Sequence, residues 1–496
     1  LLPVRLGRAG KPSVRRTENV EVAMPIAMIA RPVQLSLEQR LLRCLAREEL
    51  DEQRQHRELR AQPVELRVLD GECIQGAIFR GEHDGGFVFE VADNSSKFRA
   101  GDPLAIGDGV DLERSMPLAY GSYDAQRREL RCEPDPFARD GVVELEVGAT
   151  YVLDRRPLGL SGRLRDAVRA AFATPQLKHV LEGSHRPSRD EARLARAMER
   201  LAPELNEAQR AAGAAAIATE SLALVQGPPG TGKTRLLASV VKALCAHGCR
   251  VALCAFTHRA VDNALLALRA IEKDLPLFKL ASTSSENRAL LRRANVQIVD
   301  ARRVRPPERG CVVAGTCFQI TKLHERERFH YTVFDEAGQL PIPHALPGML
   351  RAQRWLFFGD HQQLPPVVTA AHADREAAAS IFEHLHERYG SHLLDTTYRM
   401  NDGVCRVVSE TFYGDRLRPA ATAAPRRMPF VPGGRLDEVL DPEVPVAWLR
   451  VDHRQPGQRS PEEANAVADL VDDLVRRHGV PPRESAVIAA LRAQVR

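Results

Sequence analysis

The spacing of apolar residues changes along the chain, and each pattern predicts a different element. From Ser36 to about Ala61, leucines recur at helical intervals among dense charges, which predicts a long, exposed helix. Between Pro63 and Leu153 the period becomes two, in the segments VELRVL, GGFVFEVA, VVELEVG and ATYVLD, with Gly, Asp and Asn turns between them. Several short strands at this spacing predict a small antiparallel β-barrel.

Helical spacing returns in SGRLRDAVRAAF and SRDEARLARAMERL, so the barrel interrupts two helical segments and is expected to sit on a helical stalk. Beyond them, the short apolar runs ALVQG, RVALCAFT, CVVAGT, YTVFDEA and RWLFFGD each precede a loop and a helical pattern, which predicts an open parallel α/β sheet. The predicted divisions are a loose tail at 1–32, a stalk at 33–62 and 156–200, a barrel at 63–155, and α/β domains at 201–390 and 391–496.

Composition constrains the function only weakly. The 496 residues exceed the roughly 250–300 at which single cores stop growing, so several domains are expected. A formal charge of +5 is compatible with a polyanionic partner but does not identify one. No run of 18 apolar residues is present, so a membrane partner is not expected. The Ala- and Arg-rich, Lys-poor usage favours a GC-rich bacterial genome.

The nine cysteines include no CxxC pair. Cys245, Cys249 and Cys254 lie closest together in the sequence, but their spacing fits no common zinc site. We therefore expect buried thiols in a reducing compartment, and this predicts a cytoplasmic protein.

A glycine-rich loop is the strongest chemical signal. The strand-like SLALVQ runs directly into GPPGTGKT and then into the helical RLLASVVKAL. The loop consists of Gly227, Pro228, Pro229, Gly230, Thr231, Gly232, Lys233 and Thr234. It matches G-x-x-x-x-G-K-[ST] between a strand and a helix, where backbone amides and the helix N-terminus bind phosphates. We predict an ATP site in which Lys233 neutralises the β- and γ-phosphates and the Thr234 hydroxyl holds Mg²⁺.

A pair of carboxylates follows a later apolar run. The segment HYTVFDEAGQ places Asp335 and Glu336 at the end of a buried strand. Asp335 is predicted to hold the Mg²⁺ ion through water, and Glu336 to polarise the attacking water as a general base. Because GPPGTGKT also occurs in ring-forming AAA+ ATPases, other segments must decide the class of protein.

Those segments resemble motifs of superfamily 1 helicases. They are LNEAQR at Leu205–Arg210, CAFTHRAVDNAL at Cys254–Leu265, GTCFQI at Gly315–Ile320, FFGDHQQLPPVV at Phe357–Val368 and LDTTYRMN at Leu394–Asn401. The resemblance is to the 5′→3′ branch, which includes the nonsense-mediated-decay helicase and the flap-processing Dna-type helicases. An AAA+ protein would have no reason to carry GDHQQLPP.

The resemblance implies a role in ATP use for four residues outside the glycine-rich loop. Gln209 would hydrogen-bond the adenine edge, and Tyr398 would stack on the same base. Gln363 would sense the γ-phosphate, and Arg399 would reach it from the second domain. Gln363 and Arg399, together with Lys233 and Glu336, are expected to be catalytic.

The same resemblance implies that Thr257, His258 and Thr316 contact the phosphate backbone of a single-stranded nucleic acid. It implies tandem RecA-like P-loop domains, the second incomplete, preceded by the stalk and the barrel. The expected activity is an ATP- and Mg²⁺-dependent helicase that moves 5′→3′ along a single strand. Backbone contacts hardly distinguish DNA from RNA, and the bacterial composition slightly favours DNA.

The sequence departs from the family near its end. ESAVIAALRAQVR at 484–496 matches the family's VITPYRAQ strand and helix only loosely, and the later QG and TRA motifs do not occur. We therefore expect a fragment that binds ATP but hydrolyses it weakly. Two alternatives stay open: an ATP-switched clamp that grips nucleic acid without unwinding it, and the helicase part of a nuclease–helicase whose nuclease domain or partner lies outside this chain.

Overall fold

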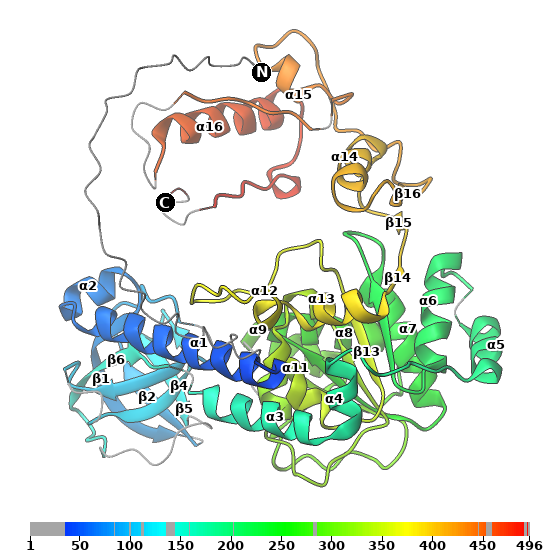
Figure 1. Cartoon of the computed structure of the whole chain (residues 1–496). Coiled ribbons are helices and arrows are strands. Elements are labelled where there is room, and N and C mark those ends of the chain that lie inside the picture. The colour runs from blue at the N-terminus through cyan, green and yellow to red at the C-terminus, as the bar shows by residue number, and fades with distance from the viewer. Residues whose placement is uncertain are drawn as a thin grey trace, which may run out of the picture. The chain divides into compact units, whose positions relative to one another are not determined.

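The computed structural model describes residues 35–490 and residue 494, apart from gaps at 84, 99–100, 111–113, 135–143, 158, 202, 281–284, 445 and 453–458. The tail predicted at 1–32 lies outside these residues. Figure 1 shows the elements in chain order, from a barrel through an α/β core to a group of C-terminal helices. No helix in the described ranges is long and apolar enough to cross a membrane.

The barrel predicted near the N-terminus is confirmed as a closed, six-stranded antiparallel barrel. Its strands are β1 (Cys73–His83), β2 (Gly86–Glu90), β3 (Pro103–Gly107), β4 (Met116–Asp124), β5 (Glu129–Pro134) and β6 (Thr150–Arg155). Around the barrel they follow the order β1-β2-β5-β4-β3-β6. Alternate side chains of each strand face inward, so that Phe79, Phe89, Leu104 and Leu130 fill the interior.

The segment VELRVL was expected to be a barrel strand and is instead helix α2 (Val64–Leu69). Arg67 is only 2% exposed and pairs with Asp154 of β6, whereas the apolar Leu69 is 72% exposed. The prediction from alternation is wrong because a buried ion pair, and not an apolar face, orients this segment. A sequence pattern of apolar residues carries no information on such a pair.

An eight-stranded parallel sheet forms the α/β core. Its strands are β7 (Leu222–Gln226), β8 (Arg250–Ala255), β9 (Leu277–Leu280), β10 (Gln297–Val299), β11 (Cys311–Thr316), β12 (Tyr331–Phe334), β13 (Trp355–Gly359) and β14 (His392–Leu393). They follow the order β10-β9-β11-β8-β12-β13-β7-β14. All five apolar runs predicted to be parallel strands are confirmed. Because the strands are parallel, all their carboxyl ends meet at one edge of the sheet, where ligands of such folds bind.

Helices cover both faces of this sheet, and each face has its own buried cluster (Figure 1). One face is covered by α1 (Leu37–Arg60), α3 (Ser161–Ala173), α4 (Pro175–Leu181), α10 (Cys317–Ile320), α11 (Ile342–Met349), α12 (Arg375–Ala378) and α13 (Ile381–Tyr389). The other face is covered by α5 (Glu191–Arg200), α6 (Glu207–Ala218), α7 (Lys233–Ala246), α8 (His258–Ile271) and α9 (Ser285–Arg293). Burial on both faces explains why these strands are continuously apolar rather than alternating.

The long helix α1 packs its leucines on the core and is tied to the loop that follows β13. Leu41 is fully buried in the cluster of that face. Arg40 forms an ion pair with Asp374 at 2.6 Å, and Glu48 accepts a 2.9 Å hydrogen bond from the backbone N–H of Thr369. The stalk helix is therefore anchored by polar contacts as well as by apolar packing.

The chain after Leu394 forms three α-helices and two short strands, among the residues that the structure describes. They are β15 (Thr396–Thr397), α14 (Asp402–Phe412), β16 (Arg418–Pro419), α15 (Asp437–Leu440) and α16 (Pro461–Arg476). The two strands pair with each other in a two-stranded parallel sheet. A small buried cluster of Cys405, Tyr413 and Leu417 forms the apolar core of this part of the chain.

Two further segments predicted to be strands are not strands. Residues 144–148 of VVELEVG form no strand, and Val147 is 71% exposed. Residues 485–490 of ESAVIAAL are also irregular, with Ile488 92% exposed. In both places the apolar run has no neighbouring strand to pair with among the described residues, and pairing, not propensity alone, makes a strand.

Candidate active site

The glycine-rich loop leaves β7 at Gln226 and ends at the N-terminus of α7, which begins at Lys233. Gly230 and Gly232 have φ values of 76° and 77°, in the left-handed region that favours glycine. A side chain at Gly227 would come within 2.8 Å of the Lys233 side chain, so the close approach of the backbone there also requires glycine. The loop thus presents its amides and the positive end of a 14-residue helix to one point.

The two carboxylates predicted after β12 lie beside this loop. The Nζ of Lys233 is 2.7 Å from a carboxylate oxygen of Glu336. Glu336 itself has a φ of 51°, a left-handed conformation that is rare for a residue with a side chain and is common at functional sites. Burial raises the pKa of Asp335 to about 6; Lys233 partly opposes this shift, and the neighbouring Glu336 adds to it. A nearby cation would stabilise the ionised form of such a buried carboxyl group and so lower its pKa.

Asp360, at the end of β13, links three segments around the loop. Its two carboxylate oxygens accept hydrogen bonds from Gln226 (3.0 Å), Gln363 (2.9 Å) and the Tyr413 hydroxyl (2.6 Å). The Gln363 amide also lies 3.5 Å from the backbone oxygen of Gly227. Burial, together with the hydrogen bond to Asp360, raises the pKa of Tyr413 far above its ordinary value. The sensor glutamine is therefore held against the phosphate loop by a buried aspartate.

Neither Asp360 nor Tyr413 was singled out from the sequence. Asp360 stands inside GDHQQLPP, which carries the family pattern, so a signal for it was present; Tyr413 lies in the segment FYGDRL at Phe412–Leu417. What the sequence did not reveal is that these two segments, 53 positions apart, meet in one hydrogen bond.

The segment Thr397–Arg399, which begins in β15, lies directly on the phosphate loop. Thr397 donates its hydroxyl hydrogen to the carbonyl of Pro229 at 2.9 Å, and the backbone N–H of Tyr398 donates to the carbonyl of Gly230 at 2.8 Å. A side chain at Gly230 would collide with the Cβ of Arg399. The structure thus brings the predicted Tyr398 and Arg399 to the loop, although Thr397 follows Pro229 by 168 positions.

Gln209 lies under the loop, as the third residue of α6. Asn206 caps this helix, and the two residues form a reciprocal capping box. The Gln209 amide accepts from the backbone of Asn206 at 3.0 Å and donates to the carbonyl of Thr231 at 2.8 Å. Gln209 is only 3% exposed, so the residue predicted to bind adenine supports the loop in this structure. Asn206 also donates to the hydroxyl of the 40%-exposed Tyr398 at 3.0 Å.

The three residues predicted to bind nucleic acid gather at the carboxyl ends of β8 and β11, which are neighbours in the sheet. Thr257 is exposed and caps α8, accepting a hydrogen bond from Ala260 at 3.2 Å. Thr316 is 4% exposed and caps α10. Burial lowers the pKa of His258 to about 4, and nearby lysines add to the effect, so this imidazole is neutral at physiological pH. Thr257 is therefore the most accessible of the three.

These features define the class of the α/β core: a P-loop nucleotide-binding domain with its site at the carboxyl edge of a RecA-like parallel sheet. Residues 204–427 match one AAA domain family, and residues 377–496 match a second AAA domain family. Together the two matches span more than half of the chain. These matches fit a superfamily 1 helicase of the DNA2/NAM7-like type.

Curated relatives agree with this assignment. The DNA replication ATP-dependent helicase/nuclease JHS1 of Arabidopsis thaliana is 29% identical over 310 residues, which are 58% of this chain and 23% of that protein. DNA replication ATP-dependent helicase/nuclease DNA2 of Xenopus laevis is 27% identical over 327 residues, which are 59% of this chain and 31% of that protein. The chain therefore spans less than a third of the length of these two relatives.

Among solved structures, the complex of Arterivirus nonstructural protein 10, a helicase, with DNA is 13% identical. That match covers 66% of this chain and 60% of the viral chain, with a TM-score of 0.35. A TM-score this low supports no conclusion on fold or function.

Proposed function

We propose that this chain is the motor portion of an ATP-driven helicase that moves along single-stranded nucleic acid, with DNA favoured over RNA. The curated relatives are named DNA replication helicase/nucleases, and this supports the choice of DNA. The observation that carries the proposal is the contact of Thr397–Arg399 with the phosphate loop. A nucleotide bound at that loop would touch both the α/β core and the segment that follows β14, and such an arrangement can convert ATP binding into relative motion.

ATP would bind with its phosphates in the amides of the glycine-rich loop and on Lys233. Thr234 and Asp335 would hold a Mg²⁺ ion, which would neutralise phosphate charge when bound. The raised pKa of Asp335 supports this fit, because a cation beside it would stabilise the ionised form. The residues present are thus the hydroxyl and carboxylate donors that Mg²⁺ prefers.

Glu336 is the general base of the proposed hydrolysis and accepts the proton of the attacking water. Without nucleotide, Lys233 holds Glu336 at 2.7 Å. A γ-phosphate attracts Lys233 away from this carboxylate, so the base becomes free when the substrate is in place. The ion pair therefore keeps the Glu336 carboxylate occupied until ATP binds.

Gln363 would report the γ-phosphate through Asp360 to Tyr413, and Arg399 would approach the same phosphate from the segment after β14. As the contact between Arg399 and the γ-phosphate forms and breaks, the chain would alternately bind and release the nucleic-acid strand. Thr257, His258 and Thr316 would hold its backbone, with the 5′→3′ direction following from the family. Backbone contacts make such binding salt-dependent and largely independent of sequence.

A clamp that remodels nucleic acid without unwinding it is the second candidate, because it would use the same ATP site. The relatives' description as helicase/nucleases also allows a nuclease domain or partner outside this chain. We further place the protein in the bacterial cytoplasm, a location that its nine free cysteines support.

The test is the ATPase rate with and without single-stranded DNA or RNA, followed by displacement of a labelled strand from a 5′-tailed duplex. We expect stimulation by a single strand and displacement that requires ATP. Stimulation without displacement would favour the clamp. No stimulation by any strand, with nucleotide binding intact, would overturn the motor assignment. Thr257→Val is expected to weaken strand stimulation more than it affects the strand-free rate, and Thr411→Val is its matched control at an exposed helical threonine.

A further inference from the structure

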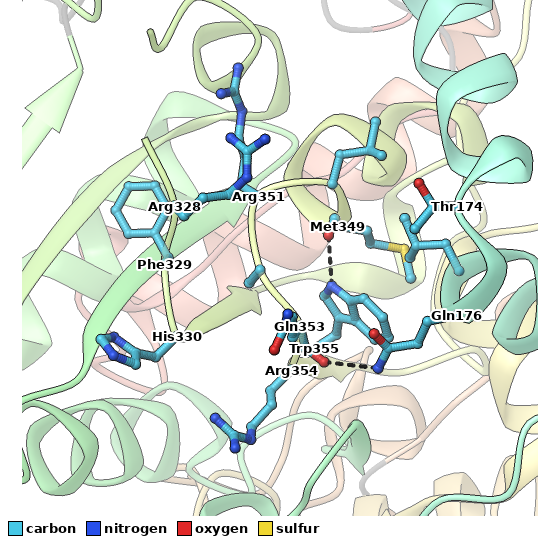
Figure 2. Close-up of a pocket in the computed structure, with 13 residues that line it drawn as sticks. Thr174, Gln176, Arg328, Phe329, His330, Met349, Arg351, Gln353, Arg354 and Trp355 are labelled. Carbon is cyan, nitrogen blue, oxygen red and sulfur yellow. Dashed lines mark hydrogen bonds between the residues drawn. The ribbon is translucent and has the colours of Figure 1, made fainter. Parts of the chain in front are cut away.

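A hollow lies at the edge of the sheet opposite the ATP site, where β12 and β13 begin. Its volume is about 500 Å³, and its walls come from α4, from the end of α11 and from the segments before the two strands. Figure 2 shows the buried indole of Trp355 at its centre, with Met349 and Gln176 beside it. A volume between roughly 300 and 1,000 Å³ is typical of sites for small ligands.

The charged side chains that line this hollow are all of one sign. Arg328, Arg351 and Arg354 line it together with His330, and no aspartate or glutamate does. The neighbouring Glu327 pairs with Arg250 at 2.5 Å. In the ranges that the structure describes, no ion pair joins any of the three lining arginines to a carboxylate. A lining of this kind favours an anionic occupant.

Two of these arginines converge. Figure 2 shows Arg328 and Arg351 extending on the same side of the hollow, whereas Arg354 points the opposite way, and its guanidinium lies over the ring of Tyr331. Burial, and next the neighbouring charge of Arg328, lower the pKa of Arg351, although Glu325 and Glu327 oppose this shift. Two guanidinium groups so close repel each other, and an anion between them would remove that repulsion.

Hydrogen bonds to backbone carbonyls hold Arg328 and Arg351 in place but leave other N–H donors of their guanidinium groups available. Arg351 donates to the carbonyls of His324 at 3.0 Å and Leu323 at 3.1 Å, and Arg328 donates to the carbonyl of Glu327 at 3.1 Å and to the carbonyl of Glu325. Each guanidinium has five N–H donors in a rigid fork that matches a phosphate group. A purely structural role for Arg351, as a brace for the loop at 321–329, explains these carbonyl contacts but not the second arginine beside it.

We propose that this hollow binds a phosphate-bearing ligand, with a phosphoryl group on Arg328 and Arg351 and an apolar part against Leu177 and Met349. The phosphate belongs either to a small free molecule of nucleotide size or to a nucleic-acid backbone that crosses this edge. The site is separate from the phosphate loop, and its occupation requires neither ATP hydrolysis nor strand movement.

The probe is inorganic pyrophosphate, titrated calorimetrically into the full chain carrying Lys233→Ala. This substitution weakens the binding of pyrophosphate at the phosphate loop. We expect one remaining binding event, which Arg328→Ala weakens by at least about tenfold. Arg326→Ala, at an exposed arginine that does not line the hollow, is the matched control and leaves the affinity unchanged. Because Arg351 also braces a loop, Arg351→Lys is the second variant; it keeps the charge and loses the fork, and it is expected to weaken binding less than Arg328→Ala.

No binding to the Lys233→Ala chain, or equal weakening by Arg328→Ala and Arg326→Ala, would overturn the proposal. Competition with a twelve-nucleotide oligothymidylate separates the two sources of phosphate. Displacement of pyrophosphate, lost in Arg328→Ala, supports a backbone phosphate. Retention of pyrophosphate in excess oligonucleotide supports a small free ligand.

Discussion

The two sides of the ATP site differ in how firmly they are built. Lys233, Asp335 and Glu336 stand at the ends of an eight-stranded sheet whose strands are buried on both faces. Tyr398 and Arg399 follow a two-residue strand, and the helix α16 further on has no buried residue. The core therefore fixes the side of the site that carries Lys233, Asp335 and Glu336. The side that carries Tyr398 and Arg399 can move at a small cost in free energy.

A few polar bonds hold the weaker side to the stronger one. They are Thr397 to Pro229, Tyr398 to Gly230, Asn206 to Tyr398 and Tyr413 to Asp360. Net contributions of such bonds are about 0.5–1.5 kcal/mol each, so ATP binding can rearrange them. Segments that move in a functional cycle are drawn from this low-stability end of a structure.

The largest expected effect lies on the firm side. Glu336→Gln removes the general base but keeps the size of the side chain, so the turnover number should fall about 10²- to 10⁴-fold. Nucleotide binding should be retained, because the phosphate loop is unchanged. Steady-state ATPase assays and binding of a fluorescent ATP analogue check both points. A turnover close to that of the parent would show that another residue is the base.

Lys233→Ala comes next, with an expected loss of about 10²- to 10³-fold in turnover together with weaker ATP binding. The lysine is the group that we expect to neutralise the phosphates, so binding and chemistry should fail together, unlike in Glu336→Gln. Lys242→Ala, further along α7, is the control, since Lys242 bonds to Ile271 and Glu272, away from the loop. Unchanged ATP affinity in Lys233→Ala would contradict the assigned site.

Asp335→Asn should stabilise the ligand-free protein while it weakens Mg²⁺-dependent ATP binding. The folded pKa of Asp335, about 6, is above its ordinary value of 3.8, so the folded state binds the proton more tightly than the unfolded state. The penalty for the buried charge is complete above the folded pKa and disappears as the pH falls toward the ordinary value. We expect a gain on the order of 2–3 kcal/mol at about pH 8, and a smaller gain at about pH 5.

Chemical unfolding of the parent and of Asp335→Asn at both pH values measures this difference, and the comparison cancels the contribution of every other titrating group. If Asp335→Asn were less stable than the parent at the higher pH, the carboxylate of Asp335 would have to be paired favourably in the folded protein.

The smallest effects are expected on the weaker side. Tyr413→Phe removes a buried hydrogen bond to Asp360 and should cost about 1–2 kcal/mol. Tyr398→Phe removes a bond between exposed groups and should cost less than about 0.5 kcal/mol. Hydrogen exchange of residues 397–417 checks both, and we expect faster exchange there only in Tyr413→Phe. Equal protection in the two variants would mean that the Asp360 contact does not hold this segment.

The sequence was most informative where a pattern has one structural solution. A glycine-rich loop between strand and helix, and five continuous apolar runs, predicted the core and the position of the phosphate loop. It was least informative where partners far apart decide the conformation. VELRVL became a helix through the Arg67–Asp154 pair, and ESAVIAAL is no strand because no described segment pairs with it.

By itself, the sequence determined the order of the elements, the residues of the phosphate loop and the carboxylate pair after β12, because their chemistry depends on local spacing. Only the tertiary structure decided that Gln209 braces the loop, that Tyr413 bonds Asp360 and that Arg328 and Arg351 converge at the opposite edge. The first of these contacts joins positions 22 residues apart, and the second joins positions 53 residues apart. Folding alone brings such positions together, because the energy of packing, and not the local pattern, selects which distant side chains meet.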